Sequence, residues 1–304
     1  MRTSRALRTV ALGAVAVGVA APVVRQRLRL RPGLVSALSW QAPVALALAR
    51  PRSGLRDAGI YALQMWAYLA HYEMPNDDPE RMLARVRVDY PIKADTLLGG
   101  GTVPTVRLQR ALGRPGHVRA HDLALAWVHW TWFIVPHGTS AYVLLRHRWH
   151  FPRAACMMAA VFDLGLVGYW ALPTAPPWWA GKSGRMPHVR RIMVEAGEHF
   201  WGRFWRPLYD FLGGNPFAAM PSLHFATSVM AAHVLGDVGH VEGVLGWSYA
   251  LSLGFALVYL GEHYVVDLIA GFALAEGVRA LAPAAGRALA PAARAIQRLE
   301  PGAA

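Results

Sequence analysis

The sequence is poor in cysteine and in charged residues. Its one cysteine, Cys156, lies in an apolar segment, so no disulfide can form within the chain and a role as a small packing residue is the simplest interpretation. Only 16% of the 304 residues are charged, against about 25% in an average soluble domain. This shortage of charge argues against an ordinary soluble protein.

Apolar residues are abundant instead. Hydrophobic residues make up 55% of the chain, which has 12 tryptophans and a mean hydropathy of +0.26. The formal net charge is +13, but the arginines are scattered between apolar segments and form no basic stripe interleaved with aromatic residues. We therefore expect a membrane protein that contacts membrane lipids and phosphorylated lipids rather than nucleic acid.

Six apolar segments approach the roughly 20 residues needed to cross a bilayer. They predict an all-α, polytopic bundle of about six transmembrane helices. The first segment is either a signal anchor or a signal cleaved near Ala20 and Ala21. The segments lie near residues 6–24, 121–145, 154–172, 222–238, 243–262 and 264–281.

The basic residues beside these segments predict an orientation. Arginines follow the second segment and recur in the C-terminal tail, which places both regions and the N-terminus on the cytoplasmic side. We expect the membrane to be a bacterial-type plasma membrane. Residues 25–120 and 173–221 then lie on its outer side. The short apolar runs 33–49 and 58–71 are either interfacial or re-entrant helices, or a pair that crosses and returns.

The chain is accordingly divided into four regions. We expect an N-terminal signal anchor with a basic flank, then interfacial helices with an extracytoplasmic loop, then a transmembrane catalytic core, and last a cytoplasmic tail rich in Ala, Arg and Pro. These regions cover residues 1–32, 33–120, 121–282 and 283–304.

A histidine stands at the predicted outer start of the fourth segment, in "AMPSLHFATSVMAA". Pro221 and Ser222 are residue types favoured at the start of a helix, so His224 is expected in the first turn. Free N–H groups and the macrodipole make such a helix start suitable for a phosphate. The alternative is a buried histidine that only satisfies packing.

A second site lies in "ALVYLGEHYVVDLIAGFAL". His263 and Asp267 are four residues apart and therefore share one helix face, where the carboxylate can fix the tautomer of the imidazole. The predicted topology returns this pair to the same outer face as His224. Glu262 either tunes this site or is a solvated interfacial carboxylate.

These motifs resemble the type-2 phosphatidic acid phosphatase superfamily, which is related to vanadium haloperoxidases. "PSLH" and "YLGEHYVVDLIAG" carry the resemblance over about residues 120–282, and "PTAPPWW" is similar to the inositol phosphorylceramide synthase branch. The resemblance implies a lipid phosphatase or phosphotransferase that needs no metal or other cofactor. It also implies that His263 is the nucleophile forming a phosphohistidine, that Asp267 orients it, that His224 protonates the leaving alcohol, and that Ser222 helps to cradle the phosphoryl oxygens.

The sequence departs from that family's pattern in its phosphate-binding cations. Ala256 and Leu257 stand where a serine-arginine pair is usual, and the earlier lysine and arginine motif is not reproduced. We expect Lys182, Arg190 and Arg191 to hold the phosphate instead, with two further arginines behind them. The alternative for each is contact with anionic lipid. The two further arginines are Arg203 and Arg206.

Other interpretations remain open from the residues alone. His129 and His137 either line the cavity or are structural. Trp178 and Trp179 are expected to anchor their loop at the membrane interface, and the alternative is that they grip the lipid substrate. A membrane metalloenzyme and a non-catalytic lipid binder or transporter are alternative functions. The candidate metal ligands are His224, Glu262, His263 and Asp267, or Glu195 and His199. The sequence indicates neither the lipid, nor the oligomeric state, nor whether water or an alcohol accepts the phosphoryl group.

Overall fold

The computed structural model describes residues 5–212 and 214–301, whose regular secondary structure is helical. This confirms the predicted all-α class. The helices in chain order are α1 (Arg5–Val24), α2 (Pro32–Ala49), α3 (Gly54–Glu73), η1 (Met74–Asp77), α4 (Pro79–Leu83), α5 (Asp89–Leu98), α6 (Pro104–Leu112), α7 (Ala120–Trp130), η2 (Thr131–Phe133), α8 (Val135–Arg146), α9 (Phe151–Ala171), α10 (Pro177–Lys182), α11 (Ile192–Trp201), η3 (Gly202–Phe204), α12 (Trp205–Leu212), α13 (Leu223–Gly236), α14 (His240–Tyr259) and α15 (Val265–Leu299).

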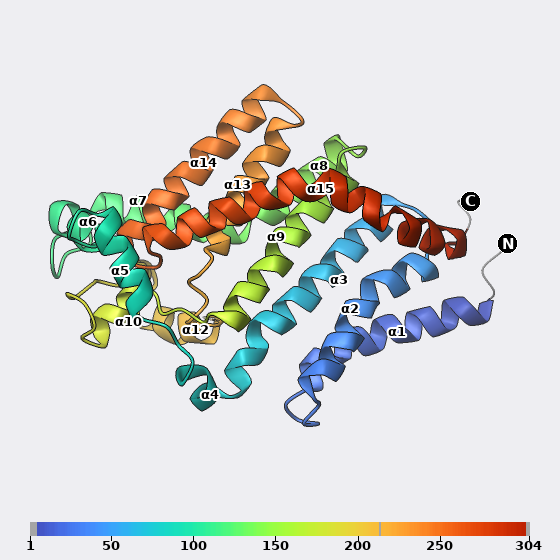
Figure 1. Cartoon of the computed structure of the whole chain (residues 1–304), viewed down its shortest axis with the longest axis horizontal. Coiled ribbons are helices and arrows are strands. Elements are labelled where there is room, and N and C mark those ends of the chain that lie inside the picture. The colour runs from blue at the N-terminus through green and yellow to red at the C-terminus, as the bar shows by residue number, and fades with distance from the viewer. Residues whose placement is uncertain (1–4, 213, 302–304) are drawn as a thin grey trace.

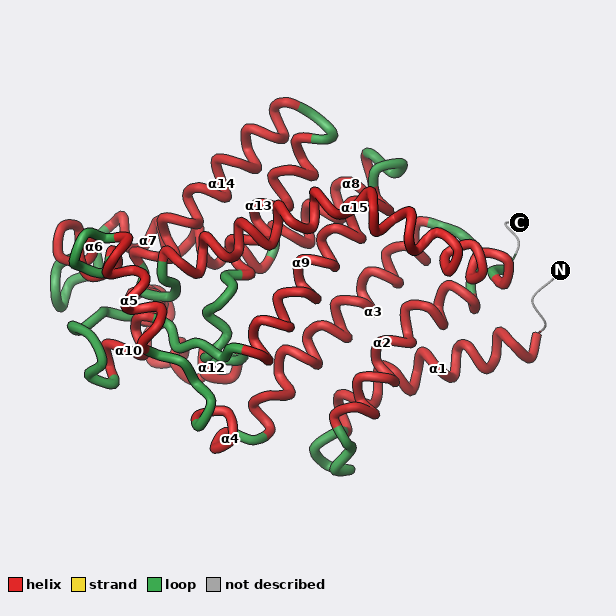
Figure 2. The backbone as a smooth tube through the Cα atoms, viewed as in Figure 1, coloured by secondary structure: helices red, strands yellow, loops and turns green. Residues whose placement is uncertain are grey.

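The long helices form an elongated bundle. Helices α1, α2, α3 and α9 follow one another side by side, α13 and α14 form an antiparallel pair, and α15 runs almost the full length of the molecule across them (Figure 1). The short helices α5, α6 and α10 gather at one end, together with much of the loop structure (Figure 2). This end also receives the start of α13, the end of α14 and the start of α15.

Four of the described helices are long and apolar enough to cross a bilayer, which makes the chain an integral membrane protein. Three of them coincide with predicted segments, namely α1, α9 and α14. The fourth is α2, so the run 33–49 is a continuous helix of 18 residues. Helix α3 follows it and packs beside it, and the two together run out and back.

Two predicted segments differ from the structure. The run 121–145 is divided into α7 and α8 by the turn η2, and Pro136 lies in the first turn of α8, where its missing N–H costs no helix bond. Helix α13 has 14 residues, so it rises about 21 Å and is too short to cross alone a hydrocarbon core of about 30 Å.

Helix α15 extends well beyond the predicted segment 264–281. It continues through Pro283 and Pro291 to Leu299. Beyond its end, the Glu300 carboxylate pairs with Arg52, at 2.7 Å, and with Arg56, at 3.3 Å, both near the turn between α2 and α3. The C-terminal region is thus attached to the end of the bundle opposite the short helices.

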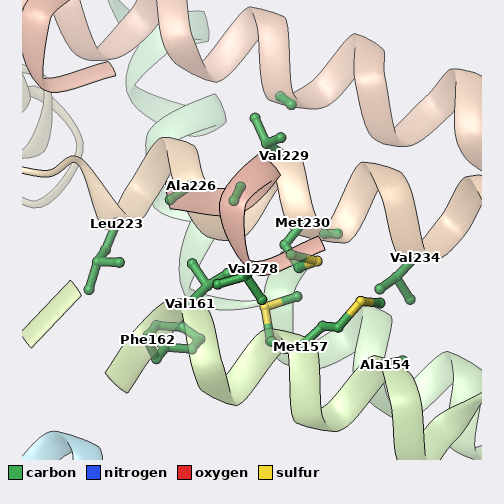
Figure 3. Close-up of a cluster of buried hydrophobic side chains, with 14 of the residues drawn as sticks. Ala154, Met157, Val161, Phe162, Leu223, Ala226, Val229, Met230, Val234 and Val278 are labelled. Carbon is green, nitrogen blue, oxygen red and sulfur yellow. The ribbon is translucent and has the colours of Figure 1, made fainter. Parts of the chain in front are cut away.

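A cluster of buried hydrophobic side chains joins α9, α13 and α15. Met157 and Phe162 of α9 pack against Leu223 and Met230 of α13 and Val278 of α15 (Figure 3). Between membrane helices, close packing rather than removal from water is the main attraction. This cluster holds the start of α13 in a fixed position relative to α9 and α15.

Two glycines allow the close approach that this packing requires. A Cβ on Gly271 of α15 would lie 2.5 Å from the carbonyl oxygen of Ser222, and a Cβ on Gly168 of α9 would collide with the ring of Pro221. The glycines therefore let both helices contact the backbone immediately before α13. This contact positions His224, which lies in the first turn of α13.

Candidate functional site

The start of α13 is fixed by Ser222. Its hydroxyl accepts a hydrogen bond from the N–H of Phe225 at 3.3 Å, and its own N–H donates to the carbonyl of Asp267 at 3.0 Å. The side chain is fully buried and acts as the N-cap of the helix. The structure therefore places Ser222 two residues before His224, with its hydroxyl engaged by the backbone.

His224 and His263 are brought together as the predicted topology requires. Nδ1 of His224 lies 3.1 Å from Nε2 of His263, and Nδ1 of His263 lies 3.4 Å from Oδ2 of Asp267. The same Oδ2 accepts the N–H of Tyr264 at 2.9 Å, which holds the carboxylate in place. With Nδ1–H of His263 directed at Asp267, its Nε2 is an acceptor that faces His224.

Burial sets the protonation state of His263. This residue lies in the link between α14 and α15, and its side chain is only 4% exposed. Desolvation disfavours the charged ring and lowers the pKa of His263 to about 4, against a smaller opposing effect of a hydrogen bond to the backbone of Ala219. At neutral pH the imidazole is therefore uncharged, and the lone pair of Nε2 is the acceptor in the hydrogen bond with His224.

The two histidines lie on the wall of a cavity of about 490 Å³. The rings of His129 and His224 are tilted against each other with centroids 4.9 Å apart, and the centroid of Trp132 lies 4.1 Å from that of His224. Both residues line the cavity, as does His137. The remaining wall is rich in aromatic side chains and comes mainly from α3, α7, α9, α10, α12 and the residues just before α13.

Several residues on this wall have an unused hydrogen-bonding nitrogen. Within residues 5–212 and 214–301, five cavity-lining side chains carry a buried nitrogen that has no hydrogen-bond partner. They are Trp66, His129, Trp130, Trp205 and Asn215. Buried polar groups are usually paired, so these five nitrogens are exceptions in the wall of the cavity.

Arg191 is the cation that the structure places at this cavity. Its guanidinium lies 3.8 Å from the ring centroid of Trp178 and 4.9 Å from that of Tyr209. Its Nε donates to the carboxylate of Glu262 at 3.4 Å, and an NH2 group donates to the hydroxyl of Tyr209 at 3.3 Å. The two aromatic rings fix the plane of the guanidinium, and the carboxylate of Glu262 accepts a hydrogen bond from its Nε–H.

The other predicted cations lie elsewhere. Lys182 is exposed at the end of α10, and Arg190 is buried against Glu195, with its Nε donating to that carboxylate at 3.1 Å. Arg203 lies over the ring of Phe204, and Arg206 pairs with Glu198. Arg191 alone among these five lines the cavity with His224 and His263.

The structure also accounts for the missing family arginine. Ala256 and Leu257 have no accessible surface, and both lie in hydrophobic clusters on α14. A cation at either position would be placed in an apolar environment without a partner. The cationic group at this site therefore comes from a different segment, at Arg191.

The candidate metal ligands do not assemble into a metal site. Across the described ranges, no group of three or more His, Cys, Asp or Glu side chains is placed to hold a metal ion. Of the second predicted ligand pair, Glu195 binds Arg190 and His199 lies against Phe200.

Sequence reasoning did not identify some of the residues that build the site. Trp132 and Tyr209 were not singled out, and Trp178 was expected first as an interfacial anchor and only second as a contact for the lipid substrate. Tyr209 is 18 residues from Arg191 along the chain and lies on a different helix, so no local spacing indicates the contact. In the sequence, the high aromatic content of residues 173–221 is the one indication that aromatic side chains contribute to the site.

Comparison with known proteins gives one family and two curated relatives. The model of the PAP2 superfamily matches residues 94–281. Phosphoinositol dihydroceramide synthase of Bacteroides thetaiotaomicron is 32% identical over 136 residues, which are 40% of this chain and 42% of that protein. The catalytic subunit of inositol phosphorylceramide synthase of Schizosaccharomyces pombe is 30% identical over 116 residues, which are 36% of this chain and 28% of that protein.

The matches to these curated relatives thus span less than half of their length. No solved structure matches the chain. The family match covers the predicted core, with His224, His263, Asp267 and Arg191, and it confirms the resemblance inferred from the motifs. The chain belongs to the PAP2 superfamily.

Proposed function

We propose that this protein is a membrane enzyme that cleaves a phosphoester of a phosphorylated lipid through a phosphohistidine on His263. The observation that carries the proposal is the hydrogen-bonded row of Asp267, His263 and His224, whose two histidines line the cavity together with Arg191. Together these groups supply a nucleophile, a proton donor and a cation for phosphoryl transfer.

In the first step, Nε2 of His263 attacks phosphorus. The P–N bond forms while the bond from phosphorus to the leaving alcohol oxygen breaks, and His224 transfers a proton to that oxygen. Since the two ring nitrogens are 3.1 Å apart, the phosphoryl group has to displace their hydrogen bond as it enters. Its negative charge favours the protonated form of His224, and Asp267 stabilises the positive charge that develops on His263.

In the second step, an acceptor hydroxyl attacks the phosphohistidine. The acceptor gives its proton to neutral His224, the new P–O bond forms, and the P–N bond breaks with its electron pair returning to Nε2 of His263. Water as acceptor gives hydrolysis, and a lipid alcohol gives transfer. Arg191 holds phosphoryl oxygens in both steps. No step assigned to these residues requires a metal ion.

Transfer of an inositol phosphate is the second candidate. Both curated relatives are named as synthases of inositol phosphorylceramide type. A cavity of about 490 Å³ is larger than a phosphate group requires, and the carboxylate of Glu262 on its wall can accept hydrogen bonds from a polyhydroxylated headgroup. We place the reaction on the extracytoplasmic face because the basic loop after α8 and the C-terminal tail lie at the opposite end of the bundle.

Incubation of the purified protein with a panel of lipid phosphates tests the proposal. Release of phosphate indicates a phosphatase, whereas a new phospholipid indicates a transferase. Orthovanadate should inhibit, strong chelators should have no effect, and His263→Ala should abolish turnover in a protein that still folds. Loss of activity with chelators would favour a metalloenzyme, and absence of turnover on the whole panel would favour a lipid binder.

A further inference from the structure

His263 lies two residues before α15 and Asp267 lies in its first turn, which is held by a side chain from a distant segment. Asp95, on α5, accepts two backbone hydrogen bonds at the start of α15. Its Oδ2 accepts the N–H of Val265 at 2.9 Å, and its Oδ1 accepts the N–H of Val266 at 2.9 Å. Asp95 has no accessible surface, so water does not compete for these bonds.

We propose that Asp95 is a positioning residue that fixes the first turn of α15 and so holds His263 against His224. The proposal rests on the function proposed above. His263 precedes Val265 by two residues, so a displacement of this turn passes directly to the imidazole. The start of a helix leaves several N–H groups without partners in the helix, and a carboxylate is the group that such a terminus favours.

Two bonds define the position of the turn better than one. A single acceptor allows the helix to rotate about the bond, whereas two oxygens on two successive N–H groups fix both its height and its rotation. The N–H of Tyr264 donates to Asp267, so three successive N–H groups are held by two carboxylates. The substrate phosphate therefore cannot use these three donors, which leaves Arg191 and the histidines to bind it.

The contact also links two parts of the molecule. Asp95 belongs to the extramembranous region and α15 to the bundle, and 170 residues separate it from Val265. Helix α5 packs against α15 at this point. The extramembranous region is thereby part of the machinery that aligns the reaction, rather than a connection between spans.

Asp95→Asn is the variant that tests this role. Asparagine has only one acceptor oxygen, so its NH2 group would face the N–H of Val265 or Val266, and two donors cannot form a hydrogen bond. We expect kcat on the most active lipid phosphate of the panel to fall about ten- to a hundredfold, as for a small misplacement of a catalytic group, while KM stays within about twofold. Asp89→Asn is the matched control, because Asp89 lies on the same helix in an exposed pair with Arg185.

Hydrogen exchange gives a readout that does not depend on turnover. Amides in a peptide covering residues 262–270 should exchange at least about tenfold faster in Asp95→Asn, because local opening governs their exchange. A peptide from α9 should exchange as in the wild type. Unchanged exchange in residues 262–270, or an equal increase in α9, would overturn the proposal.

The remaining outcomes are also decisive. A drop in kcat equal to that of Asp89→Asn would overturn the positioning role. If Asp95→Asn does not fold, Asp95→Glu is the second variant, because it keeps both carboxylate oxygens but places them one methylene further out. It should show faster exchange in residues 262–270 and a lower kcat. Wild-type values of both quantities would refute the positioning role. A wild-type protein inactive on every lipid phosphate would refute the proposed function, while the exchange data would still decide whether Asp95 holds the turn.

Discussion

Replacing Arg191 should remove most of the binding energy for the phosphoryl group. A hydrogen bond to a charged group contributes about 1.5–3 kcal/mol, and a guanidinium offers two such bonds to a phosphate. The side chain of Arg191 is 29% exposed, so water can replace part of this interaction and the lower end of the range applies. We expect Arg191→Gln to lose about 3 kcal/mol, or roughly a hundredfold in kcat/KM.

Arg191→Lys separates charge from geometry. Lysine keeps the positive charge but loses the planar contact with Trp178 and the paired N–H groups. We expect a loss of about tenfold, midway between the wild type and Arg191→Gln on a logarithmic scale. The measurement is the initial rate against lipid phosphate concentration in detergent micelles.

Two control variants accompany Arg191→Gln. This substitution leaves Glu262, which is 12% exposed, without its partner, so the double variant Arg191→Gln/Glu262→Gln is measured alongside it. Recovery of activity in the double variant would attribute the loss to the orphaned carboxylate. Lys182→Gln changes an exposed residue and should stay within about twofold. Wild-type kcat/KM in Arg191→Gln, or a hundredfold loss in Lys182→Gln, would refute the reasoning.

Three further predictions concern the histidines and the packing around them. Protonation of His263 removes the nucleophile, so the reaction rate should fall as the pH drops through the pKa of His263 at about 4 rather than near 6.5. The free energy of unfolding should fall between about pH 6.5 and pH 4, because the unfolded chain binds this proton at a higher pH than the folded protein. His224→Gln should slow esters with poor leaving groups by roughly 10²–10⁴-fold and p-nitrophenyl esters far less. Gly271→Ala, which forces a methyl group against the carbonyl of Ser222, should destabilise the protein by about 1–3 kcal/mol, whereas Gly277→Ala meets open space and should not lower the thermal midpoint.

Chain topology was sufficient to predict how the candidate site residues meet. The four-residue spacing predicted that Asp267 faces His263, although His263 lies in the link before α15 and not on the helix itself, and the turn between α13 and α14 returns His263 to the level of His224. Both arguments depend only on helix periodicity and on an antiparallel pair. The all-α class and three of the spans followed from hydrophobicity in the same way.

The choice of cation was beyond such reasoning. Arg190 and Arg191 are neighbours just before α11, yet one is buried against Glu195 and the other lines the cavity. Their directions depend on the backbone conformation of the residues before α11 and on partners from other segments, including Trp178 and Tyr209. Hydrophobic periodicity in the sequence predicts neither this backbone conformation nor these partners.

The boundaries of helices were similarly underdetermined. Residues 121–145 have nearly continuous apolar character, so the break at η2 depends on Pro136 and on packing against α13. Helix α15 passes through Pro283 and Pro291 although proline usually ends a helix. Its C-terminal part is held by the pairing of Glu300 with arginines more than 240 residues earlier.

The course of α15 has a practical consequence for how the protein can be handled. Helix α1 begins and α15 ends at the same end of the bundle, and the cavity beside His263 lies toward the other end (Figure 1). Both ends of the described chain consequently lie at one end of the bundle. Affinity tags, reporter domains or a fused second enzyme placed at either end would leave the cavity beside His263 unobstructed, and we expect two reporters at the two ends to give the same reading of sidedness.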